Sequence, residues 1–219
     1  MSDSAANPAD EGSEFSRKAG TAFGLSIAAI IMDAFGFAWL CWGYSMSPLL
    51  RNSRSDRVLP WAIWIVLYIV FLTLLSFALI AMRRARRQLK LAGTGPGYFQ
   101  DHFKKQFRLI SILEVAGIGV VIFLAAYFHR MDLLAAGISV VVGLHFLPLA
   151  RLFRFPVYNI TGIAIVLCGL LSITFLRGND ITFSAGTGTG LVLWISAGYV
   201  LRSAGKLLRG LAAQQAHVA

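Results

Sequence analysis

Long apolar segments alternate with short charged ones along the 219-residue chain. A helix needs roughly 20 consecutive apolar residues to cross a bilayer, and six segments meet that requirement. They cover residues 21–44, 58–82, 109–128, 131–150, 157–176 and 181–201. This pattern predicts an all-α membrane protein, built as a bundle of six transmembrane helices.

Composition supports lipid as the surrounding solvent. The chain is 57% hydrophobic and only 14% charged, whereas soluble domains carry roughly 25% charged residues. A soluble fold of this length has too little interior to hide so much apolar surface. We expect residues 1–20 to form a disordered cytoplasmic tail, residues 21–202 the transmembrane domain, and residues 203–219 a cytoplasmic tail.

The distribution of positive charge predicts the orientation in the membrane. If the N-terminus lies in the cytoplasm, 15 of the 20 Lys and Arg residues fall in cytoplasmic segments. This bias follows the positive-inside rule, and six spans then place the C-terminus in the cytoplasm as well. The net charge of +10 therefore requires no nucleic-acid partner, and none is predicted.

Most of this charge lies in a basic cytoplasmic loop, residues 83–108. We expect its first part to continue the second span as a helix and residues 98–108 to form a short helix in the headgroup plane. The two parts supply six basic residues for contact with anionic lipid: Arg83, Arg84, Arg86, Arg87, Lys104 and Lys105. The loop is either a lipid-sensing or docking element or simply an anchor that fixes topology.

Three ionisable residues lie inside the predicted spans, where an unpaired charge costs at least roughly 2.5–3.5 kcal/mol. Glu114 and His145 occupy neighbouring antiparallel spans at similar depth, so we expect them to meet. Asn159 lies at a comparable depth in the fifth span. These three predict a polar cluster open to the cytoplasm, with Asp33 in the first span as a deeper member.

Two interpretations of this cluster remain open. Glu114 and His145 can form a proton relay or a substrate site, because such a pair can exchange protons near neutral pH. They can equally be a structural pair that fixes the hairpin of the third and fourth spans. Two or three mixed ligands without a recognised spacing do not define a metal site, so neither a metal nor a cofactor is predicted.

The sixth span contains a glycine-rich segment, residues 184–190. Gly186 and Gly190 form a GxxxG pair, which favours close helix packing. A broken helix that lines a substrate path is the alternative, in which Thr187 and Thr189 offer hydroxyl groups to a ligand. We also expect a homodimer through the glycine-rich faces.

Residues 143–150, Gly-Leu-His-Phe-Leu-Pro-Leu-Ala, are followed by Phe-Pro-Val-Tyr at 155–158. This stretch of about thirty residues resembles a segment of small bacterial polytopic membrane proteins to which no activity is assigned. The resemblance implies a multi-pass protein of the bacterial inner membrane. It also implies that His145, Pro148 and Pro156 belong to a family pattern.

No sequence motif identifies a reaction. The chain lacks HExxH, GxSxG and Walker motifs, so a membrane enzyme is the least favoured class. The polar cluster favours a small transporter or ion-handling protein, with Glu114 and His145 at its centre. The alternative is a non-catalytic accessory or scaffold membrane protein that uses its basic segments for docking.

Overall fold

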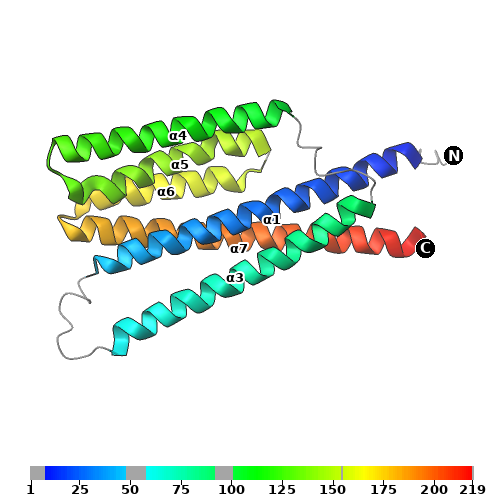
Figure 1. The fold of residues 1–219 in the computed structure, drawn as a ribbon, viewed down its shortest axis with the longest axis horizontal. Coiled ribbons are helices and arrows are strands. Elements are labelled where there is room, and N and C mark those ends of the chain that lie inside the picture. The colour runs from blue at the N-terminus through cyan, green and yellow to red at the C-terminus, as the bar shows by residue number, and fades with distance from the viewer. Residues whose placement is uncertain (1–7, 48–57, 92–100, 154, 219) are drawn as a thin grey trace.

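The computed structural model describes residues 8–47, 58–91, 101–153 and 155–218 (Figure 1). Over these residues it contains helices and no strand, and six of the helices are long and apolar enough to cross a membrane. The predicted six-helix, all-α architecture is confirmed. The elements are α1 (Pro8–Ser45), α3 (Val58–Leu91), α4 (Asp101–Tyr127), the short 3-10 helix η2 (Met131–Leu133), α5 (Leu134–Phe153), α6 (Val157–Phe175) and α7 (Asn179–Val218).

The helices form two groups of different length. α1, α3 and α7 are long and run past the other helices at the end of the molecule where both termini lie, while α4, α5 and α6 lie side by side on the other flank (Figure 1). α1 and α7 make the most extensive contact in the molecule, and α7 also packs against α5 and α6. At 1.5 Å per residue, α1 and α7 each measure about 60 Å, which is about twice the hydrocarbon thickness of a bilayer.

The helix bounds contradict two of the predictions and extend the last helix toward the C-terminus. Because α1 begins at Pro8, the expectation of a disordered tail is wrong for residues 8–20. The C-terminal segment, residues 203–218, is a continuation of α7. Residues 101–108 belong to α4 and form no separate headgroup helix. Residues 92–100, which include the start of that predicted headgroup helix, lie outside the described residues.

The long helices extend together as a three-helix assembly that we call the basic stalk, defined as residues 8–20, 83–91 and 202–218. Its seam consists of small and aliphatic side chains at spacings of three and four, which is the repeat of a coiled coil. The buried seam residues are Ala19 of α1, Ala85 and Leu89 of α3, and Ala204, Leu208 and Leu211 of α7. Mutual burial of this stripe explains why the helices continue beyond the apolar segments.

Within the apolar segments, α1 and α7 approach through glycine. A Cβ added at Gly190 would lie 2.5 Å from Cγ of Leu40, and one added at Gly43 would lie 2.6 Å from the backbone nitrogen of Thr187. Lipid gives two helices little hydrophobic reason to associate, so close backbone packing must hold them together. The glycine faces predicted to form a homodimer are therefore occupied inside the monomer, and a dimer would need another surface.

Hydroxyl pairs add polar links between the shorter helices and α7. Three side-chain pairs join them: Ser139 with Thr189 at 2.9 Å, Thr161 with Ser196 at 2.7 Å, and Ser172 with Ser184 at 3.1 Å. Measured interhelical hydrogen bonds in membranes contribute about 0.6 kcal/mol each on average. The three links therefore help to fix the register of α5 and α6 on α7.

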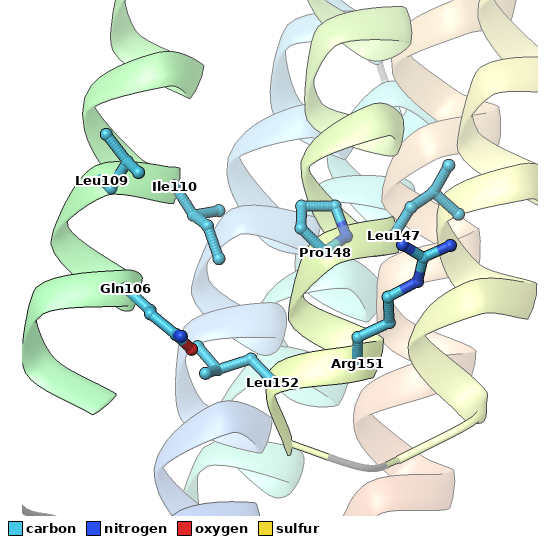
Figure 2. A pocket seen from close by; sticks show the side chains of 7 residues that line it. All are labelled: Gln106, Leu109, Ile110, Leu147, Pro148, Arg151 and Leu152. Atoms are coloured by element: carbon cyan, nitrogen blue, oxygen red, sulfur yellow. The ribbon is translucent and has the colours of Figure 1, made fainter. Parts of the chain in front are cut away.

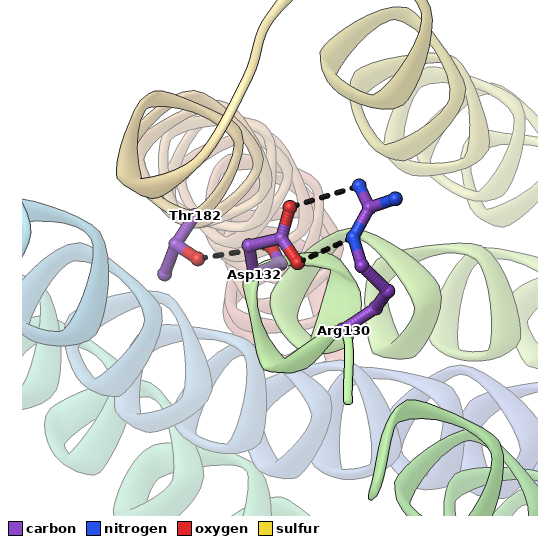
Figure 3. A network of polar contacts seen from close by, with 3 residues as sticks. All are labelled: Arg130, Asp132 and Thr182. Carbon is purple, nitrogen blue, oxygen red and sulfur yellow. Dashed lines mark hydrogen bonds and ion pairs between the residues drawn. The ribbon is translucent and has the colours of Figure 1, made fainter. Parts of the chain in front are cut away.

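The turn between α4 and α5 is tied at the end opposite the stalk (Figure 3). Arg130 donates from Nε and Nη2 to the two carboxylate oxygens of Asp132, each at 3.0 Å. The hydroxyl of Thr182 in α7 donates to the backbone oxygen of Asp132 at 3.3 Å. His129 takes a positive φ of 52°, which lets the chain reverse in so few residues. The turn thus confirms the predicted tight hairpin and attaches it to α7.

α7 contains a glycine in close contact with α1, Gly190, and a glycine with open space around it, Gly198, and the pair gives a matched test of the packing. Gly190→Ala should lower the free energy of unfolding by about 1–3 kcal/mol, because the methyl group collides with Leu40 and the Gly36 carbonyl. Gly198→Ala is the control, since nothing lies within 4 Å of its added Cβ. Thermal unfolding of the detergent-solubilised protein measures both. Equal effects at the two positions would contradict the close approach of α1 and α7.

Candidate functional site

α4 and α5 pack against each other from their hairpin toward the end that carries the basic stalk. Near the hairpin they touch closely: a Cβ added at Gly137 would lie 2.7 Å from Cγ1 of Val121, and one at Gly117 would lie 2.9 Å from Cγ1 of Val141. Beyond Gly117 toward the basic stalk, a cavity opens on each side of the α4–α5 contact. Glu114 and His145 lie on the stalk side of the close contact at Gly117.

Glu114 and His145 meet, as their depth predicts. Nδ1 of His145 lies 3.3 Å from Oε2 of Glu114, with 10% of the His145 side chain and 24% of the Glu114 side chain exposed. Nδ1 makes no hydrogen bond within the described residues. The contact with Glu114 is an ion pair when the imidazole is protonated. Partial exposure of the carboxylate leaves it reachable by a third group.

That exposure is toward a cavity of about 520 Å³ between α1 and the α4–α5 pair. Its walls are largely aliphatic and aromatic, and four polar side chains interrupt them. The polar lining residues are Ser111, Glu114, His145 and Tyr158, and the apolar lining includes Phe23, Ile27, Ile31 and Phe35 of α1. An apolar cavity of this size with a few converging polar groups has the character of a small-molecule site.

The cavity reaches the surface of the bundle between α1 and α4. Ile31 is 49% and Phe35 58% exposed on α1, so part of the wall faces outward at the level of the spans. At the stalk end, the rings of Phe107 in α4 and Phe153 in α5 lie 6.4 Å apart, edge to face, and both line the cavity. A ligand can therefore approach from the bilayer, past apolar side chains.

Asn159 does not belong to this cluster, contrary to the prediction. The structure buries Tyr158, Thr161 and Gly162 of α6 against the rest of the bundle. Asn159 is one residue, and hence about 100°, away from Tyr158 around the helix, which leaves it exposed. The position of Asn159 along the chain can be read from the sequence, but the face of α6 that carries it cannot.

Asp33 is buried in a different place, on the side of α1 that packs against α7. Its side chain is fully buried and both carboxylate oxygens lack a hydrogen-bond partner within the described residues. Only its backbone oxygen accepts a hydrogen bond, from Nε1 of Trp194 at 3.2 Å. Met32 and Phe35 line the cavity and Asp33 does not, so the structure separates Asp33 from the Glu114–His145 pair.

The structure favours helix packing over a ligand path for the glycine-rich segment. α7 is continuous from Asn179 to Val218. Thr189 is fully buried and its hydroxyl pairs with Ser139, while Thr187 packs against Gly43 of α1. Neither threonine lines the described cavities, so the expectation that they contact a ligand is not supported.

The basic residues predicted to contact lipid lie apart from the cavity. The four arginines at 83, 84, 86 and 87 are exposed around the buried Ala85 on the stalk. Lys105 is exposed on the first turns of α4, and the side chain of Lys104 lies outside the described residues. None of the five described residues lines the cavity beside Glu114.

Sequence reasoning missed the contribution of α1 to this cavity. Phe23, Ile27, Ile31 and Phe35 recur every four residues and form one ridge on α1. The four-residue spacing can be seen in the sequence. Because a transmembrane helix is apolar on every side, this spacing does not show which ridge of the helix faces a cavity. Tyr158 was missed for the same reason.

Among the described residues, no group of three or more His, Cys, Asp or Glu side chains converges as a metal site would require. No known protein family matches the chain, and neither curated proteins nor solved structures show significant similarity to it. The site must therefore be interpreted from its own geometry.

The Glu114–His145 contact can be measured by a double-mutant cycle. Glu114→Gln and His145→Gln should show a coupling free energy of about 1 kcal/mol in thermal or denaturant unfolding, since contacting residues are non-additive. Asn159→Ala combined with His145→Gln is the control and should be additive within about 0.5 kcal/mol. A Glu114–His145 cycle that is also additive would show that the two side chains do not interact.

Proposed function

We propose that the protein is a small membrane transporter that binds a small amphipathic solute in the cavity beside Glu114 and exchanges it for protons. The observation that carries this proposal is the position of the Glu114–His145 pair in the wall of a 520 Å³ apolar cavity. Ionisable side chains are rare and costly within a membrane and mark substrate or proton pathways.

The placement of the pair favours a ligand over a purely structural role. A pair that only fixes the α4–α5 hairpin is best enclosed, as the buried Ser139–Thr189 pair is. The carboxylate of Glu114 instead keeps a quarter of its side-chain surface exposed and lines the cavity. The cavity falls within the range of about 300–1,000 Å³ that small-molecule sites occupy.

The charge of the lining indicates the charge of the solute. Among the described residues, its titratable side chains are Glu114, His145 and Tyr158, and no Lys or Arg lines it. The lining therefore carries negative charge when the imidazole is neutral, which favours an amphipathic cation. Glu114 pairs either with the protonated imidazole or with the solute, so that solute binding releases the proton from His145.

α1 begins and α7 ends at the end of the molecule that carries the basic stalk (Figure 1). The positive charge of the stalk supports the proposal that this end is cytoplasmic. A bacterial inner membrane is the proposed location. The stalk also supports a second candidate, an accessory or scaffold protein, because its exposed arginines present a docking surface outside the spans. The two candidates differ in whether Glu114 affects a flux.

Transport is tested in proteoliposomes with tetraphenylphosphonium as the amphipathic cation. Wild-type protein should bind and exchange the cation and release protons on binding. Glu114→Gln should reduce exchange at least about tenfold, because Glu114 is the one carboxylate that the described part of the lining contains. Asn159→Ala, a polar change on the exposed face of α6, should leave exchange intact. Exchange that is absent from the wild type, or unchanged in Glu114→Gln, would favour the scaffold function.

Orientation is tested separately from transport. Single cysteines in a background with Cys41→Ala and Cys168→Ala should be labelled from the cytoplasm at position 209 and from outside at position 177 by a membrane-impermeant maleimide. Both positions are exposed. The positive-inside rule gives this outcome because the stalk holds ten Lys and Arg residues. Labelling at position 209 from outside would reverse the proposed orientation.

A further inference from the structure

A second cavity, of about 480 Å³, lies on the other side of the α4–α5 contact (Figure 2). Gln106, Leu109 and Ile110 of α4 form one wall. The opposite wall belongs to α5 and combines apolar side chains, including Leu147 and Pro148, with the guanidinium of Arg151. We call this space the Arg151 groove. Its polar residues, Gln106 and Arg151, come from the stalk ends of α4 and α5, and its apolar residues extend toward the middle of the spans.

The Arg151 side chain forms no ion pair with any described residue. Arg151 lies in the last turn of α5. Helical side chains lean toward the N-terminus of their own helix, and Figure 2 shows Arg151 running back along α5 toward Leu147. The exposed side chain of Arg151 thus lies along the apolar part of α5, where its charge can meet an anion at the edge of the groove.

We propose that the Arg151 groove binds one anionic phospholipid of the surrounding bilayer, with the lipid phosphate on Arg151 and an acyl chain along Leu109 and Ile110. Leu109 is 58% and Leu113, one turn further along α4, 63% exposed, so the groove continues into the lipid-facing surface of α4. A chain can therefore enter sideways from the bilayer. The planar guanidinium matches phosphate oxygens in a bidentate geometry.

The charge and size of the groove select among possible occupants. No acidic side chain of the described residues lines it, so none of them holds the amine of a zwitterionic headgroup. Lys105 precedes Leu109 by one helical turn on the same face of α4 and adds a second positive charge at the open end. Free phosphate would fill only a small part of the 480 Å³ and would leave the apolar walls uncovered.

The site is distinct from the cavity beside Glu114, which lies on the opposite side of α4 and α5. The two share Leu152 but no charged residue. The lipid proposal therefore does not rest on the proposed transport function, and either can fail without the other.

Native mass spectrometry of the full chain, released from nanodiscs of mixed phosphatidylglycerol and phosphatidylcholine, counts the retained lipids. We expect one phosphatidylglycerol to be retained in preference to phosphatidylcholine, and Arg151→Gln to weaken that retention about tenfold, as expected for loss of a charge-assisted bidentate contact. Arg86→Gln is the matched control, because Arg86 is exposed at the same end and lines neither cavity. Equal retention in Arg151→Gln and Arg86→Gln would overturn the proposal.

A second variant tests the apolar part of the groove without changing charge. Leu109→Trp fills the space with an apolar ring at a lipid-facing position, and it should also reduce phosphatidylglycerol retention about tenfold while Arg151 stays in place. A thermal-unfolding assay with inorganic phosphate tests whether the site binds a free anion and not a lipid. If phosphate stabilises the detergent-solubilised wild type as much as phosphatidylglycerol does, and Leu109→Trp has no effect, the site binds a free anion and the lipid proposal is wrong.

Discussion

The close approach of α1 and α7 is the contact on which the rest of the molecule depends. Lipid is as apolar as the helices themselves, so burial alone does not bring spans together. Glycine at 43 and 190 lets the two backbones meet where any side chain would collide. Once α1 and α7 are joined, α3 packs on both of them, α5 and α6 pack on α7, and the three long helices can extend together as the basic stalk.

The same contact creates the cavity. Because one face of α1 is used against α7, its ridge of Phe23, Ile27, Ile31 and Phe35 is turned toward α4 and α5. Near the hairpin, Gly117 and Gly137 accept valine side chains and bring α4 and α5 close together. The space between the ridge and the α4–α5 pair is left unfilled. Glu114 and His145 lie in its wall, within the spans, where an ionisable group needs a function or a partner.

The two ends of the α4–α5 pair differ in chemistry. At one end the Arg130–Asp132 pair and the Thr182 hydroxyl fix the turn to α7. At the other end α4 begins with exposed cations, and cavities flank its contact with α5 on both sides. One cavity carries the carboxylate of Glu114 and the other the guanidinium of Arg151. The two cavities therefore differ in the charged residues that line them, although they share one pair of helices.

The sequence by itself determined the six spans and the depth of each polar residue, because crossing a bilayer requires a fixed length of apolar helix. Depth was enough to predict that Glu114 and His145 meet, since the short turn at 129–130 makes their helices antiparallel neighbours. Only the tertiary structure decided which way each helix faces. An apolar span carries no amphipathic pattern to show its buried side, so the sequence did not reveal that Asn159 points outward, that Asp33 faces α7, or that α1 completes the cavity. The sequence also predicted that residues up to 20 are disordered. In the structure, mutual burial of alanine and leucine side chains keeps α1, α3 and α7 packed together well beyond the membrane-spanning segments.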